Sequence, residues 1–209
     1  MQDASQKIGG LCSDMDRRFA KRLKIYFIEE SKVEVTIIRH GKVKHTWKKN
    51  CSSEEFDEEC RLYDIAPIEE MSKAAICDAS KIYISTLDRS YQTAKNMYGD
   101  GAFCRTELIN EVPLKAAFDT KLKLPTWFWN ISGRLQWMAN CSRQPEARAQ
   151  TVKRAERFTN GIVERNEDCV VVTHGFFMHT LISVMKRRGF NCDKTSAHYK
   201  NGEAIILTL

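Results

Sequence analysis

The feature that most constrains this chain is a short apolar run that ends abruptly in Arg39, His40 and Gly41. Residues 33–38 read V-E-V-T-I-I, and their β-branched apolar side chains predict a buried strand. A charged pair followed by glycine cannot continue such a strand, so we expect these residues at the sheet edge where open parallel sheets bind ligands. Arg39 carries a fork of donors suited to phosphate, and His40 carries a nitrogen nucleophile. Taken alone, the tripeptide fits an ordinary solvated strand end equally well.

Two further strands are predicted to bring charged side chains to the same edge. Residues 169–173, C-V-V-V-T, form a second buried run that ends in His174 and a glycine. A third run at 81–84 is followed at once by a helix whose first turn carries Arg89. Because the carboxyl ends of parallel strands meet at one edge, two arginines and two histidines can converge there around a dianionic phosphoryl group. These four residues are Arg39, His40, Arg89 and His174.

Strands and helices alternate along the rest of the chain. Further strands are expected at 103–106 and 204–209. Helices are expected at 13–30, from a capping box at Ser52 to about residue 63, near 69–78, from a cap at Ser85 or Thr86, and over 146–166 and 177–188. This alternation predicts an α/β fold of three layers, a mostly parallel sheet with helices on both faces.

The chain is predicted to form one domain over residues 33–209, preceded by an N-terminal extension. In that extension, residues 1–32, apolar side chains recur at four-residue steps and predict an amphipathic helix. Residues 115–143 are rich in aromatic side chains and contain Pro125 and Gly133, which predicts an irregular insertion rather than one clean helix. We expect a small cap over a pocket here, with a satellite core as the alternative.

The composition argues against several classes of function. Thirty-three basic against 27 acidic residues give a net charge of +6, but the basic residues are scattered, so nucleic-acid binding is not expected. The eight cysteines contain no C-x-x-C pair, which argues against a zinc site and favours free thiols. We recognise neither a signal peptide nor a stretch of membrane-spanning length, and therefore expect a cytoplasmic protein without a membrane partner.

The sequence resembles the histidine phosphatase superfamily, with its phosphoglycerate-mutase-like fold, over about residues 33–209. The matching motifs are I-I-R-H-G at 37–41, S-T-L-D-R-S-Y-Q-T-A at 85–94, I-N-E-V-P at 109–113 and V-V-V-T-H-G at 170–175. By this resemblance His40 is the nucleophile that becomes phosphohistidine, and Glu111 is the proton donor. Arg39, Arg89 and His174 would hold the phosphoryl oxygens and stabilise the charge that develops during transfer. The resemblance implies a phosphomonoesterase that acts on a small phosphorylated metabolite and needs no metal or cofactor.

Departures from the family pattern refine this expectation. Lys42 and Thr46 stand where members often carry an acidic or amide residue and an asparagine, so the residues of one phosphate contact are replaced. The residues after Glu111 differ from those of the mutases, and the interval to His174 is short, which favours the phosphatase branch. The nearest alternatives to Glu111 as proton donor are Asp119 downstream and Glu107 upstream.

Two other functions stay open at this stage. The first is a phosphate-binding or phosphoprotein-binding module of the same fold with weak or no catalysis. The second is a metal hydrolase that uses His40 and His174, which is less favoured because no carboxylate stands at ligand spacing beside either residue. The other histidines are interpreted as a solvated loop residue at His45, a structural residue at His179 and a polar loop residue at His198. Neither the identity of the substrate nor the oligomeric state can be read from the sequence.

Overall fold

The computed structural model describes residues 33–71, 81–192, 194 and 198–209. The helix predicted at 13–30 lies outside these residues and stays a prediction. The same is true of the helix predicted near 69–78, apart from its first three residues, which are not helical. The described residues belong to the compact unit Val33–Leu209.

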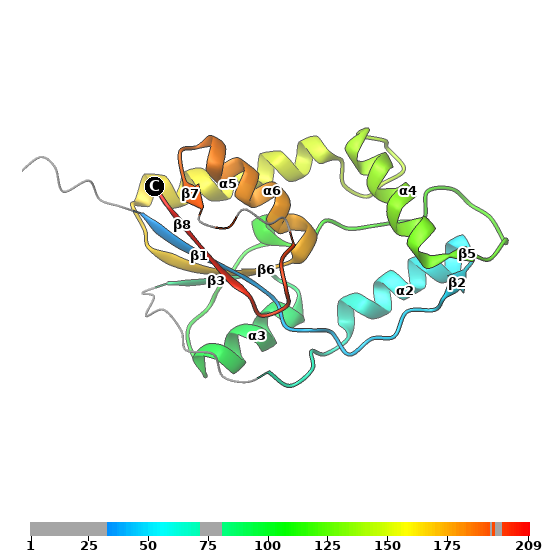
Figure 1. Cartoon of the computed structure of the whole chain (residues 1–209), viewed down its shortest axis with the longest axis horizontal. Coiled ribbons are helices and arrows are strands. Elements are labelled where there is room, and N and C mark those ends of the chain that lie inside the picture. The colour runs from blue at the N-terminus through cyan, green and yellow to red at the C-terminus, as the bar shows by residue number, and fades with distance from the viewer. Residues whose placement is uncertain (1–32, 72–80, 193, 195–197) are drawn as a thin grey trace, which may run out of the picture. The chain divides into compact units, whose positions relative to one another are not determined.

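The centre of this unit is a six-stranded sheet with the order β4-β3-β6-β1-β8-β7 (Figure 1). Four strands run parallel, whereas β7 and β8 are antiparallel to their neighbours. The strands are β1 (Glu34–Arg39), β3 (Ile82–Ile84), β4 (Cys104–Arg105), β6 (Cys169–Thr173), β7 (Asn191–Cys192) and β8 (Ala204–Thr208). The predicted α/β class with a mostly parallel sheet is confirmed.

Alternate side chains of the central strands pack on opposite faces of the sheet. Val35 and Ile37 of β1 are buried in one apolar cluster with α5 and α6, whereas Ile38 is buried in another with α3. These helices are α3 (Asp88–Tyr98), α5 (Arg148–Arg165) and α6 (Gly175–Arg187). Figure 1 shows α5 and α6 on one side of the sheet and α3 on the other. Because both faces are covered, the strands are continuous apolar runs rather than alternating ones.

A separate group of elements, called here the α2–α4 unit, packs around its own small core. It consists of the strand pair β2 (Asn50–Cys51) and β5 (Leu124–Pro125) and the helices α2 (Ser53–Ile65) and α4 (Thr126–Met138). Phe56 of α2 and Trp129 of α4 are fully buried against each other, with ring centroids 6.0 Å apart. The capping box predicted at Ser52 is confirmed, since its hydroxyl accepts from the Glu55 N–H and its own N–H donates to the Glu55 carboxylate.

The prediction of an irregular segment at 115–143 is wrong for its central part, because α4 is a clean 13-residue helix. Pro125 does not interrupt this helix; it stands immediately before the first residue, where proline is tolerated. Gly133 lies inside the helix for a packing reason. A Cβ there would lie 2.7 Å from Leu114 Cδ1 and 3.0 Å from the Lys115 carbonyl, so glycine allows α4 to approach that backbone closely.

Two predicted helix starts are also corrected. α3 is not capped by Ser85 or Thr86: its N-cap is Leu87, which makes no side-chain cap bond. The Ser85 hydroxyl is bonded instead to His174 and Ser90. α6 begins at Gly175, two residues earlier than predicted, so that the helix starts directly after the histidine. A short 3-10 helix, η1 (Glu107–Ile109), follows β4 and leads into the segment that carries Glu111.

Candidate active site

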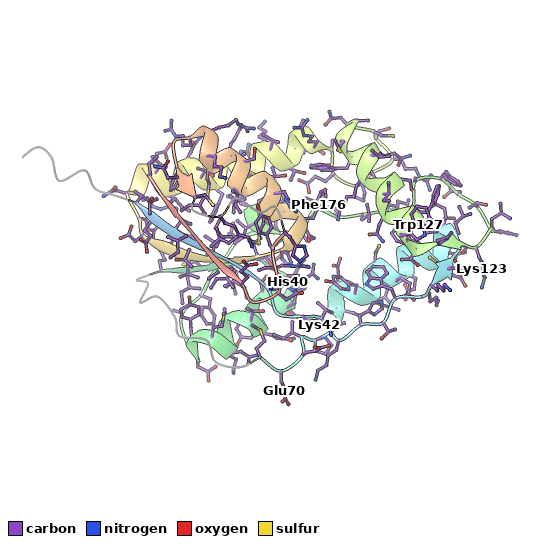
Figure 2. All side chains as sticks on the ribbon, in the orientation of Figure 1. His40, Lys42, Glu70, Lys123, Trp127 and Phe176 are labelled. Carbon is purple, nitrogen blue, oxygen red and sulfur yellow. The ribbon has the colours of Figure 1, made fainter. Side chains whose placement is uncertain are left out.

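The two histidines of the motifs are brought together by strand register. Arg39 is paired with Thr173 at the end of the β1–β6 ladder, and the His40 N–H donates to the Thr173 carbonyl at 2.9 Å. The next residue after each strand is therefore a histidine, and the ring centroids of His40 and His174 are 5.0 Å apart. Figure 2 shows His40 just beyond the end of β1.

The imidazole of His40 is held with one nitrogen open. Nδ1 lies 2.7 Å from the carbonyl oxygen of Gly41, and because a carbonyl only accepts, Nδ1 carries the proton and Nε2 carries the lone pair. The residue is 1% exposed. Burial is the main cause that lowers the pKa of His40 to about 3, and the positive charges of Arg89 and Arg39 add to it. His40 is therefore neutral at physiological pH, with a lone pair available for attack.

Arg89 is fully buried and divides its guanidinium among several partners. Nε donates to Nδ1 of His174 at 3.0 Å, and Nη1 donates to Oδ1 of Asp64 at 2.9 Å. A guanidinium can only donate, so Nδ1 of His174 is unprotonated and its Nε2–H donates to the Ser85 hydroxyl at 2.7 Å. Burial and the charge of Arg89 hold the pKa of His174 well below its usual range. Both ring nitrogens of His174 are thus occupied within the protein.

Two buried guanidinium nitrogens in the site have no acceptor in the part of the chain that the structure describes. Nη1 of Arg39 donates to the Tyr199 carbonyl at 2.5 Å. Among the described residues, however, nothing accepts from Nε of Arg39 or from Nη2 of Arg89. The absence of a side chain at Gly175 leaves room for the Arg39 guanidinium, since a Cβ at Gly175 would lie 2.7 Å from Arg39 Nε. Unsatisfied buried donors are costly, so this pair suits an anion with several acceptor oxygens.

Glu111 is fixed at the amino end of α6, close to the histidines. Its Oε1 accepts from the N–H of Val112 and from the N–H of Phe177, each at 2.9 Å, and its Oε2 lies 3.3 Å from the N–H of Phe176. The first turn of a helix presents free N–H groups, which explains why the carboxylate settles there. The sequence-predicted proton donor therefore lies beside the helix that follows His174.

The segment before Glu111 is held by one arginine. Nη1 of Arg154 donates to the carbonyls of Leu108 and Asn110 at 3.0 and 2.7 Å. The same guanidinium forms a two-pronged ion pair with Glu146, with distances of 2.7 and 3.2 Å. The two carbonyl bonds tie α5 to the backbone immediately before Glu111, and the ion pair holds the guanidinium that makes them.

A cavity of about 1090 Å³ opens beside these residues. Arg89 and Glu111 lie in one part of its wall, and α2 and α4 supply the other part. Figure 2 shows Trp127 on α4, one of the aromatic residues that line it. The predicted insertion thus provides only half of the outer wall. The other half comes from residues 47–64, which were not expected to take part.

The comparison with family models decides the identity of the chain. Residues 35–208 match the model of the histidine phosphatase superfamily (branch 1). The chain belongs to this superfamily. The resemblance drawn from the motifs is thereby confirmed, and so is the prediction that the chain is a histidine phosphatase by family.

Two similar solved structures share the fold of this chain, and a third is less similar. A mycobacterial glucosyl-3-phosphoglycerate phosphatase is 15% identical, with a TM-score of 0.51, and the match covers 75% of this chain and 80% of that one. A protein named mycobacterial hydrolase 2 is also 15% identical, with a TM-score of 0.50 and coverage of 85% and 82%. A phosphoserine phosphatase from Entamoeba histolytica is 16% identical, with a TM-score of 0.47 and coverage of 83% and 89%. A comparison with curated proteins gives no match.

The residues that replace the family pattern in this phosphatase do not line the cavity. Lys42 is exposed and pairs with Glu69 at 2.9 Å, and Thr46 is exposed and does not line the cavity.

The two alternatives for the proton donor differ in their position relative to the cavity. Asp119 forms an exposed ion pair with Arg143, whereas Glu107 is an exposed residue of the cavity wall.

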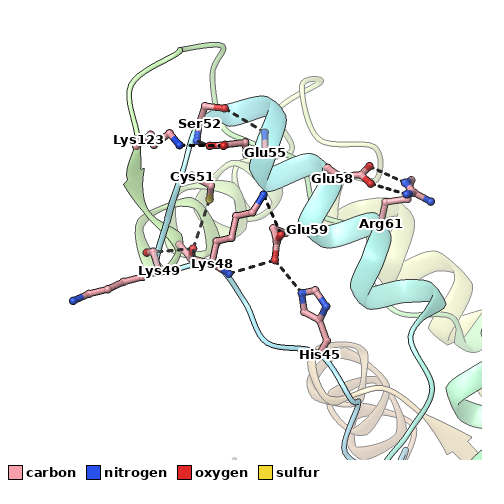
Figure 3. Close-up of polar contacts among 11 residues, drawn as sticks. His45, Lys48, Lys49, Cys51, Ser52, Glu55, Glu58, Glu59, Arg61 and Lys123 are labelled. Atoms are coloured by element: carbon pink, nitrogen blue, oxygen red, sulfur yellow. Dashed lines mark hydrogen bonds and ion pairs between the residues drawn. The ribbon is translucent and has the colours of Figure 1, made fainter.

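His45 is not the solvated loop residue that the sequence suggested. Its Nε2 lies 3.0 Å from Oε2 of Glu59, and the side chains are only 12% and 5% exposed (Figure 3). The Lys48 N–H donates to the same carboxylate oxygen at 3.3 Å. These contacts tie the segment after His40 to α2. His179 lies on α6, as predicted, with its ring 4.9 Å from that of Tyr199.

Several residues around the site were missed by the sequence analysis. Asp64 pairs with Arg89, the Thr93 hydroxyl accepts from the Gly41 N–H at 2.8 Å, and the Asn201 amide donates to the His40 carbonyl at 2.9 Å. Thr93 stands inside the motif at 85–94 and could have been singled out. Asp64 and Asn201 come from a helix end and a turn whose sequences carry no signal of their own.

The described residues contain neither a metal-binding cluster nor a membrane-spanning helix. Within them, no three His, Cys, Asp or Glu side chains are grouped in a way that could hold a metal ion. In the same part of the chain, no helix is both long enough and apolar enough to cross a membrane. The six cysteines that the structure describes all have free thiols.

Proposed function

We propose that this phosphatase hydrolyses phosphomonoesters through a phosphohistidine formed on Nε2 of His40. The observation that supports this most directly is a neutral, buried His40 with an open Nε2 in a site where Arg39 and Arg89 each keep one buried N–H without an acceptor. A phosphoryl group offers oxygens to these donors while its phosphorus faces the nucleophile.

Two chemical steps follow from the arrangement. In the first, the Nε2 lone pair attacks phosphorus and the bond to the leaving oxygen breaks, while protonated Glu111 gives its proton to that oxygen. In the second, the Glu111 carboxylate takes a proton from a water molecule, the water oxygen bonds to phosphorus, and the P–N bond breaks. The result is inorganic phosphate, with His40 and Glu111 restored.

The positive charge for transfer comes from the guanidinium groups in this proposal. Arg39 and Arg89 hold their charge in a buried site, where electrostatic stabilisation is stronger than in water. His174 supports transfer chiefly by positioning Arg89, to which it is bonded at 3.0 Å. For His174 Nε2 to contact the phosphate directly, its hydrogen bond to the Ser85 hydroxyl has to break.

We propose a small phosphorylated metabolite as substrate, bound with its leaving group under α2 and α4 as a cap. The cavity volume of about 1090 Å³ suits such a molecule. One structural neighbour is named for a phosphorylated small molecule, glucosyl-3-phosphoglycerate. A cytoplasmic location, suggested by the cysteine usage, belongs to the same proposal.

A screen of phosphomonoesters in excess EDTA tests the activity, and rapid quench tests the intermediate. We expect turnover with chelator present and an acid-labile, alkali-stable phosphoryl label on the protein. His40→Ala should abolish both the label and turnover, whereas His179→Ala, which removes an exposed histidine of α6, should keep the label. Phosphate binding without turnover on any ester would favour the alternative, a binding module. Loss of activity in EDTA with recovery on adding zinc or magnesium would favour a metal hydrolase.

A further inference from the structure

Arg134 reaches from the α2–α4 unit to the residues that hold Glu111. Its Nη1 donates to the carbonyl of Val112 at 3.0 Å, and its guanidinium carbon lies 3.7 Å from the centroid of the Phe176 ring. Val112 follows Glu111 in sequence, and the N–H of Phe176 faces the Glu111 carboxylate. Arg134 therefore lies on the side of the cavity where the proposed proton donor meets the leaving group.

The other arginines of the cavity wall each have a carboxylate partner. Arg89 pairs with Asp64 at 2.9 Å, Arg154 with Glu146 at 2.7 Å, and Arg61 with Glu58 through a contact of 2.6 Å. These pairs account for three of the four arginines that line the cavity.

Arg134 differs from them. No carboxylate of the described residues lies within ion-pair distance of it, and none of these residues accepts a hydrogen bond from its Nε or Nη2. Its side chain is half-buried, and burial is the main reason that its pKa is lowered, against the opposing effect of the Glu111 and Glu146 charges. A half-buried charge without a hydrogen-bonded ionic partner gains stability when an anion binds it. The Nε–Nη2 edge is the geometry that binds a carboxylate or phosphate through two parallel hydrogen bonds.

We propose that Arg134 binds an anionic group on the leaving-group half of the substrate, so that the preferred substrates are phosphomonoesters with a second anionic group, a carboxylate or a second phosphate. This inference rests on the proposed phosphatase function and adds the substrate class. The Val112 bond keeps the guanidinium in place before the substrate arrives, which lowers the ordering cost of binding.

The test compares three esters that differ in one substituent: glycerol 1-phosphate, 3-phosphoglycerate, in which a carboxylate replaces one hydroxymethyl group, and glycerol 1,3-bisphosphate. For wild type we expect kcat/KM to be about tenfold or more higher for at least one of the two doubly anionic esters, as a charge-assisted pair allows. Whichever ester gains more identifies the second group. Arg134→Gln, which removes the charge, should lower the ratio of kcat/KM between the doubly anionic esters and glycerol 1-phosphate towards one. Arg134→Lys should keep part of the preference, and the control Arg61→Gln should keep all of it.

The rate on glycerol 1-phosphate also reports whether each variant is folded. Equal kcat/KM for all three esters in wild type would overturn the inference, and so would a preference that survives Arg134→Gln. Either result leaves the phosphatase proposal standing, because that proposal is overturned by different results: no turnover of any ester, no phosphoryl label on the protein, or activity that depends on an added metal.

Discussion

Arg89 donates its Nε–H to Nδ1 of His174 across 3.0 Å, and this bond sets the protonation of the histidine. The guanidinium cannot accept, so the imidazole proton is confined to Nε2. Because Nη1 of the same arginine is engaged by Asp64, one nitrogen, Nη2, is left for a ligand. One buried side chain thereby orients His174 and keeps a donor free for the proposed substrate.

Arg89→Lys should disrupt both functions. A lysine ammonium is a point charge without the fork, so it cannot bond His174, Asp64 and a phosphoryl oxygen in the same geometry. We expect kcat/KM to fall by about 10²-fold or more, the typical cost of one transition-state donor. Nitrogen NMR of the histidine ring should also show Nε2-protonated His174 in wild type and a changed tautomer mixture in the variant. Arg143→Lys, at the exposed pair with Asp119, is the control; similar losses in the two variants would contradict the assignment.

The buried neutral His40 should make the fold sensitive to acid. Its pKa is about 3 in the folded protein against an ordinary value of 6.5. Between these values the unfolded chain binds the proton that the folded chain refuses, so the free energy of unfolding decreases as pH falls from 6.5 towards 3. The slope contributed by one such histidine is at most about 1.4 kcal/mol per pH unit. Urea denaturation of wild type and His40→Gln at several pH values checks this. The variant should lose stability less steeply, and parallel curves would show that His40 does not contribute.

Glu111→Gln should separate substrates by their leaving groups. An alkyl phosphate leaves as a basic alkoxide and needs a proton, whereas 4-nitrophenyl phosphate leaves as a stable phenolate. In single-turnover measurements of the first step we expect the alkyl ester to slow by about 10²–10⁴-fold and the nitrophenyl ester far less. Glu107→Gln is a matched control from the same cavity wall and should affect the two esters alike. Equal slowing of both esters by Glu111→Gln would remove Glu111 from the role of acid.

Gly175→Ala should weaken phosphate binding through a steric effect on Arg39. The added Cβ would lie 2.7 Å from Nε and 2.9 Å from Cζ of that arginine, so the guanidinium has to move. We expect at least about a tenfold weaker inhibition by vanadate, because one charge-assisted bond is lost. Gly101→Ala, whose Cβ would meet nothing closer than 3.6 Å, should leave inhibition unchanged. Unchanged vanadate inhibition in Gly175→Ala would mean that Arg39 does not need this approach.

The strand ends could be predicted from sequence because apolar β-branched runs and the charged residues after them are local signals. The register that sets His40 beside His174 then follows from parallel pairing. The pairing of the α2–α4 unit could not be predicted in the same way. Trp129 and Phe56 meet across 73 positions of sequence, and nothing near either residue specifies the other.

Local propensity also failed where packing decides the outcome. Gly133 reads as a helix breaker, yet it lies within α4 because Leu114 and Lys115 come so close. Ser85 is a good helix cap by type, but its hydroxyl is taken by His174. Arg134 could not be singled out from the sequence, since an arginine in a helix is ordinary. Only the folded structure shows that it has no ion-pair partner among the described residues.

The pairing of β1 with both β6 and β8 has a consequence for synthesis on the ribosome. Residues 34–39 are made early, but their two neighbours in the sheet are residues 169–173 and 204–208. β1 therefore cannot complete its pairing with both neighbours until about 170 further residues have emerged, and until then its apolar side chains lack part of their cover. At typical rates of translation this takes from about ten to thirty seconds. Chains released before residue 204 should lack an ordered His40 loop and depend on chaperones.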